Sequence, residues 1–163
     1  MRAMRLGNTT ACAEAEAFVR KEAATYRTAR LSVSLKYARS GSAPIRGRFN
    51  RREARILVLV DAVAQVPFLL RYPIRTQGGS GGHFWWIYDE ELAESLEELV
   101  VWTFFHEFHH FLCHSGQAQG DWETKANAYG FEMLRKYKSQ RLVTVNETRR
   151  TNDESSDEWG NGG

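Results

Sequence analysis

The stretch LVVWTFFHEFHHFLCH, which runs from Leu99 to His114, contains the pattern that decides the fold. Its first half is apolar apart from one threonine, and its second half carries four histidines. An apolar run of this length with helical spacing predicts a buried helix. Residues four apart lie about 40° apart around a helix axis, because one turn holds 3.6 residues. The imidazoles of His106 and His110 therefore leave the helix on the same face.

The segment His106-Glu107-Phe108-His109-His110 has the H-E-x-x-H spacing, which is typical of zinc peptidases. Zinc accepts two neutral imidazoles and a carboxylate, and it keeps a fourth position for a water molecule whose pKa it lowers. Glu107 can reach that water without binding the metal, so we predict that it acts as the catalytic general base. The structural alternative is a pair of core histidines with ordinary polar partners. A metal would satisfy both buried imidazoles at once, and this favours the zinc site.

The other histidines and the nearby cysteine receive different predictions. His109 lies about 100° from His110 around the helix and is predicted to face solvent or a neighbouring element. His114 lies one turn beyond His110 and is predicted to support the edge of the site without binding zinc. His83 is predicted to be structural, and Cys113 to be a small apolar residue.

Helices and strands on both sides of this stretch predict an α+β fold with an N-terminal helix, a small mixed sheet, the active-site helix and a following glutamate-bearing helix. The N-terminal helix is expected from Ala11 to about Arg30, where apolar residues recur at helical spacing. A glycine-rich turn is expected over residues 78–82. The strands are expected at Leu31–Tyr37, Arg55–Val60 with both faces buried, Phe68–Tyr72 ended by Pro73, and His83–Tyr88.

The acids from Asp89 to Glu94 suit a helix start, because carboxylates offset the positive end of the helix dipole. A long helix is therefore predicted from Asp89 to about His114, and a further helix from Asp121, as N-cap, to about Lys138. The chain is divided into a flexible N-terminus over residues 1–10, one metallopeptidase-like domain over 11–140 and a tail over 141–163. Four acids without a base predict disorder in the last dozen residues.

The overall composition excludes several classes of protein. A formal net charge of +2 gives no global field that would select nucleic acid or an acidic membrane, so any such argument must be local. Only two cysteines occur, far apart in sequence, which speaks against a disulfide framework and favours a reducing cytoplasmic setting. No apolar run is long enough for a membrane span or a signal peptide. The sequence does not predict an oligomeric state.

The segment His106-Glu-Phe-His-His110-Phe-Leu-Cys-His114, followed by Glu123-Thr-Lys-Ala-Asn127-Ala-Tyr-Gly-Phe131, resembles the ImmA/IrrE metallopeptidase family. The pattern of that family is H-E-x-x-H-x-x-x-H followed by E-x-x-A-N-x-F/Y. The resemblance implies a zincin-like fold in which His106, His110 and Glu123 hold zinc. It also implies a peptide or protein substrate, because members of the family cut repressor proteins in bacteria and mobile elements.

Helical geometry separates the three acids that follow the motif. Small and apolar residues lie three, four, seven and eleven positions after Glu123, which places Glu123 on the face that packs against the active-site helix. Asn127 shares that face and is predicted to hydrogen-bond a metal ligand. Asp121 is about 200° away and suits the N-cap, whereas Glu132 is about 180° away and should face water.

A second function class rests on a cluster of arginines that could neutralise phosphates. The structural alternative is a solvated loop and strand edge, since no recognition helix or aromatic stacking pattern accompanies the cluster. Binding of nucleic acid, together with a structural zinc site, therefore stays open as an alternative. A third alternative is a catalytically inactive metallopeptidase homologue. The arginines of the cluster are Arg46, Arg48, Arg51, Arg52 and Arg55.

Overall fold

A four-stranded sheet forms the base of the molecule. The computed structural model describes residues 4–38 and 43–156, and the strands lie in the order β1-β2-β4-β3. Neighbouring strands are parallel except for β3, which is antiparallel to β4 and occupies one edge. The strands are β1 (Arg5–Asn8), β2 (Ser32–Ala38), β3 (Ile45–Asn50) and β4 (Arg55–Asp61).

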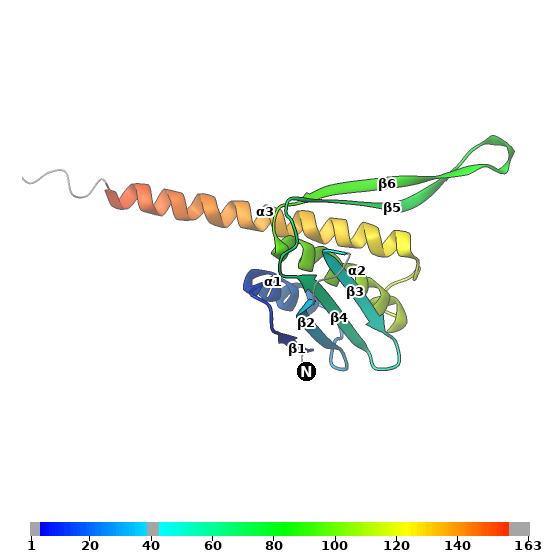
Figure 1. The fold of residues 1–163 in the computed structure, drawn as a ribbon, viewed down its shortest axis with the longest axis horizontal. Coiled ribbons are helices and arrows are strands. Elements are labelled where there is room, and N and C mark those ends of the chain that lie inside the picture. The colour runs from blue at the N-terminus through cyan, green and yellow to red at the C-terminus, as the bar shows by residue number, and fades with distance from the viewer. Residues whose placement is uncertain (1–3, 39–42, 157–163) are drawn as a thin grey trace, which may run out of the picture.

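Three helices complete the α+β architecture (Figure 1), and the main core lies between α1, α2 and one face of the sheet. Helix α1 (Ala13–Ala23) joins β1 to β2, while α2 (Leu96–His114) packs against β3 and β4. Buried residues alternate along β2 and β4, because successive side chains of a strand point to opposite faces. Strand β4 is therefore not buried on both faces as predicted: Leu57 and Leu59 are only half-buried, since no described helix covers the outer face.

A long antiparallel hairpin, β5 (Phe68–Gly78) and β6 (Phe84–Ala93), follows the sheet and projects beyond the body of the molecule (Figure 1). Its tip contains the glycine-rich turn, with a short 3-10 helix, η1 (Ser80–Gly82). The prediction that Pro73 ends the first strand is wrong. Strand β5 continues past it through an irregularity in the register between Pro73 and Arg75.

The predicted helix start at Asp89 is also wrong, because Asp89 to Ala93 belong to β6. The acids of this segment are bound across the gap to α3 (Glu123–Ser156): Arg135 pairs with Asp89 and Glu91, and Lys138 also pairs with Glu91. Helix α2 starts only after Ser95, whose side chain accepts a hydrogen bond from the backbone N–H of Glu98 and caps the helix. The helix ends at His114, as predicted.

Helices α2 and α3 pack closely and hold a second core cluster. A Cβ on Gly130 would lie 3.0 Å from both the backbone oxygen and the indole nitrogen of Trp102. Small residues on α3 predicted that this helix would approach α2 closely, and it does so at Gly130. The buried residues of this cluster are Leu70, Ala93, Leu99, Trp102, Phe131 and Leu134.

Helix boundaries and termini differ from the predictions in three places. Helix α1 ends at Ala23, where the hydroxyl of Thr25 bonds the carbonyl oxygen of Glu22 and competes with a further helical turn. Residues 5–8 form strand β1, which pairs with β2, although no strand was predicted there. Helix α3 continues past Lys138 to Ser156, since the sequence between these two residues contains no glycine or proline. Of the tail for which disorder is predicted, residues 152–156 are the last residues of α3, and residues 157–163 lie outside the described chain.

Candidate metal centre

His106, His110 and Glu123 come together where the middle of α2 faces the first residue of α3. One ligand atom from each residue lies within 4.8 Å of the others, and no other such group of three occurs in the described part of the chain. The Nε2 atoms of His106 and His110 lie 3.2 and 3.3 Å from the two carboxylate oxygens of Glu123. Both imidazoles are mostly buried, whereas the carboxylate is 74% exposed. This donor set is the one that zinc accepts in hydrolytic sites with an open fourth position.

His110 is held from behind by a carboxylate. Its Nδ1 lies 2.5 Å from Oδ1 of Asp121, and the other oxygen of Asp121 is paired with Arg51. The hydrogen bond to His110 is the main reason why the pKa of Asp121 lies below its usual range. An Nδ1–H donated to Asp121 fixes the ring so that the lone pair of Nε2 points at the metal position.

The surroundings of His106 favour a neutral imidazole. Burial lowers its pKa to about 4, with Glu123 and Asn127 opposing the shift and His110 adding to it. The neutral ring that a metal requires is therefore the stable form near neutral pH. Asn127 is buried and donates from Nδ2 to the carbonyl oxygen of Pro73, 2.9 Å away. No hydrogen bond of normal geometry reaches Nδ1 of His106 from the described residues.

Glu107 occupies a tight space between α2 and β3. Its side chain is buried, and a Cβ on Gly47 would come within 2.6 Å of Oε1. Burial raises the pKa of Glu107 to about 7, and the nearby Glu123 adds to the rise. His110 and a hydrogen bond from the backbone of Phe49 oppose it. Glycine is thus the residue that lets strand β3 lie against the predicted general base.

An open pocket of about 420 Å³ gives access to this group. One wall is the edge strand β3, and the other is formed by α2 and the start of α3. The backbone groups on the free side of an edge strand are available for pairing with an added chain. The lining residues are Gly47, Arg48, Phe49, Arg51, His106, Glu107, His110 and Glu123.

The remaining predicted residues divide into those near the site and those away from it. His114 is exposed, and its ring lies edge-on to that of Phe49, a lining residue of the pocket, so it lies at the rim of the site. His109 is buried against the ring of Tyr129 and lies 3.7 Å from Sγ of Cys113. His83 lies at the exposed hairpin tip, remote from the cleft. Glu132 is exposed, as predicted.

Asp121 is the clearest correction within the site. It is not the N-cap of α3, because the carbonyl oxygen of Trp122 accepts the first helical hydrogen bonds, from Lys125 and Ala126. Asp121 lies outside the helix, so the 100° step per residue does not describe where its side chain points. Gly120 has a φ of 83° and turns the chain just before it, which brings the carboxylate onto His110. Gly47 and Arg51 were also missed, since strand β3 was not predicted.

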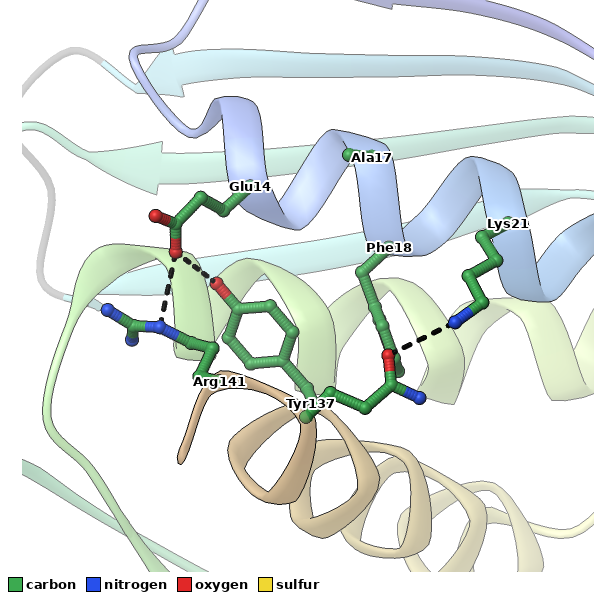
Figure 2. A pocket seen from close by; sticks show the side chains of 7 residues that line it. Glu14, Ala17, Phe18, Lys21, Tyr137 and Arg141 are labelled. Carbon is green, nitrogen blue, oxygen red and sulfur yellow. Dashed lines mark hydrogen bonds and ion pairs between the residues drawn. The ribbon is translucent and has the colours of Figure 1, made fainter. Parts of the chain in front are cut away.

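A second pocket, of about 430 Å³, lies between α1 and α3 (Figure 2). Glu14 points into it and is bound by Arg141 at 3.1 Å and by the hydroxyl of Tyr137 at 3.3 Å. Lys21 reaches Gln140 on its other side. Its single acid is already paired and its lining contains no histidine or cysteine, so it lacks the chemistry of the metal centre.

Comparison of the chain with known protein families, with curated proteins and with solved structures gives no match. None of the described helices is long and apolar enough to pass through a membrane.

Proposed function

We propose that the chain is a zinc-dependent peptidase with a zincin-like fold. The observation that carries the proposal is the convergence of His106, His110 and Glu123 from two helices, with Glu107 beside them. Zinc bound there would supply a water nucleophile at neutral pH, because the ion lowers the pKa of coordinated water. The likeness of the motifs to those of the ImmA/IrrE metallopeptidases supports the same assignment.

Glu107 is the general base in this proposal. Its carboxylate takes a proton from the attacking water and passes it to the nitrogen of the leaving amine. The pKa of Glu107 is about 7 in the metal-free protein, so near neutral pH the carboxyl group can both accept and release a proton. The backbone N–H of Phe49 holds the carboxylate in place, and the absence of a side chain at Gly47 leaves room for it.

Strand β3 supports a polypeptide as the substrate. It forms the edge of the sheet and one wall of the pocket, so an extended peptide can pair with its free backbone groups and lie across the metal position. The substrate is a peptide or protein segment, and a repressor protein is the candidate that the family resemblance suggests. Both cysteines are free, which fits the proposed cytoplasmic location.

The test is the Glu107→Gln variant, assayed on a library of unstructured peptides with zinc present. The amide cannot accept a proton, so turnover should fall by about a hundredfold or more, while zinc content stays that of the unmodified chain. Glu132→Ala, which removes an exposed acid from the water-facing side of α3, is the matched control and should keep full activity. Equal turnover in Glu107→Gln and the unmodified chain would refute Glu107 as the base.

A further inference from the structure

The outer face of the four-stranded sheet is a basic surface that adjoins the proposed peptidase site only at Arg48, which also lines the metal-centre pocket. The register between strands places the side chains of this face in rows, since residues that pair directly across neighbouring strands point to the same side. One row runs Arg5, Ser32, Arg55 and Asn50, and the next runs Gly7, Ser34, Leu57 and Arg48. A third row contains Lys36, Leu59 and Arg46.

The charges on this face are nearly all of one sign. Its basic residues are Arg5, Lys36, Arg46, Arg48 and Arg55, against the acid Asp61 and, in the adjoining turn, Glu53. Glu53 lies 4.0 Å from Arg55, which leaves the other four basic side chains without an ion pair to any described residue. Lys36, Arg46 and Arg48 are exposed, so no other described element covers them.

The sheet also sorts the arginine cluster into two groups. Arg51, which follows β3, pairs with Asp121 and belongs to the metal centre. Arg46 and Arg48 lie two residues apart on β3, about 7 Å along the strand, and both point away from the core. Arg51 therefore supports the metal centre and Arg46 belongs to the outer face alone, whereas Arg48 belongs to the outer face and also lines the pocket.

We propose that this basic sheet face binds the phosphate backbone of duplex nucleic acid without sequence preference. Charge complementarity favours a polyanion, because four unpaired cations spread over three strands can each approach a phosphate. The face contains no aromatic side chain in the part of the chain that the structure describes, so it lacks the platform on which single strands stack their bases.

The experiment measures binding of the full chain to a fluorescent 20-base-pair duplex across a range of salt concentrations. The unmodified chain should bind with affinity that falls linearly in a plot of log K against log salt concentration. The double variant Arg46→Ala/Arg48→Ala should reduce the steepness of that slope by about 2, because two fewer phosphates are neutralised, and should weaken binding equally for unrelated sequences. Binding should persist when zinc is removed with a chelator.

The matched control is Arg71→Ala/Arg75→Ala, which removes two arginines from hairpin strand β5. Its slope and affinity should equal those of the unmodified chain. The proposal is overturned if the hairpin variant loses binding and the sheet variant does not, or if a single strand of equal length binds more tightly than the duplex at the same salt. Binding to vesicles that contain anionic phosphatidylserine, without binding to the duplex, would overturn it as well. Because the assay measures binding and not turnover, and binding should persist without zinc, its outcome is independent of the proposed peptidase activity.

Discussion

Asp121 links helix α2 to the turn after strand β3 at the candidate metal centre, through contacts with His110 and Arg51. Its carboxylate accepts a hydrogen bond from the imidazole of His110 and also pairs with the guanidinium of Arg51. Such a partner fixes the tautomer of a metal ligand and raises its basicity. Asp121 is therefore expected to set zinc affinity although it does not reach the metal position.

Replacement of Asp121 by asparagine should weaken zinc binding by about 10- to 100-fold, because the amide holds the imidazole less strongly than a carboxylate does. The measurement is a zinc dissociation constant from competition with a chromophoric chelator. Glu132→Ala serves as the control, since it removes an acid that faces water. An unchanged dissociation constant in Asp121→Asn would show that the contact to His110 is incidental.

The grouping of His106, His110 and Glu123 was predictable from sequence because these residues lie within regular helices. His106 and His110 are four residues apart on α2, and Glu123 starts α3 on its small and apolar face. Asp121 was not predictable in the same way, because it precedes the helix and its direction depends on the turn at Gly120. Glu107 was identified by spacing alone, yet the close contact with Gly47 needed the structure.

At the scale of elements, the contact between α2 and α3 determines where Glu123 lies relative to the histidines. The helices approach each other closely at Gly130, with Trp102 opposite it. Alanine at this position would favour the helix by about 1 kcal/mol through its propensity. Overpacking in a tight contact costs about 1–3 kcal/mol, and a backbone oxygen cannot rotate away.

Gly130→Ala should therefore lower the free energy of unfolding by about 1 kcal/mol, since the steric cost exceeds the gain in helix propensity. It should also weaken zinc binding, because α3 must move outward with Glu123. Urea unfolding and zinc titration measure the two effects. A rise in stability would mean that the helices separate at no cost and that the small residue is unimportant.

The sequence patterns failed for strands that carry many charged residues. Strand β3 alternates Ile45, Gly47 and Phe49 with two arginines and Asn50, but the glycine on its inner face weakens the apolar half of this pattern as a strand signal. The acids from Asp89 to Glu91 suggested a helix start, yet they lie in a strand and bind Arg135 and Lys138 of a helix far along the chain. Ion pairs between distant segments depend on tertiary structure, and the spacing of residues within one segment does not predict them.

At the scale of the whole molecule, α2 belongs to both core clusters and also carries two of the three proposed metal ligands. A metal that joins α2 to α3 should therefore stabilise the folded chain as a unit. The α+β class follows from the sequence, because one strongly apolar helix next to alternating strands has few ways to bury its surface. The projecting hairpin did not follow, since its length depends on continuation of β5 past Pro73.

Zinc at a free concentration of about 100 times its dissociation constant should stabilise the fold by about 2.7 kcal/mol. For a chain of this size, that corresponds to a rise in Tm of about 5–10 °C. Differential scanning calorimetry with zinc and with chelator measures the shift. His106→Ala should show no shift on addition of zinc, and a shift of equal size in that variant would place the binding site elsewhere.

Zinc content is the most direct test of the central claim, that His106, His110 and Glu123 form one metal site. Elemental analysis of the purified protein should find about one zinc per chain in the unmodified protein and in Glu132→Ala, and almost none in Glu123→Ala, since two imidazoles alone hold the ion poorly. Zinc retained in Glu123→Ala but absent from His114→Ala would contradict the account, because the third ligand would then be a histidine that the structure places at the rim.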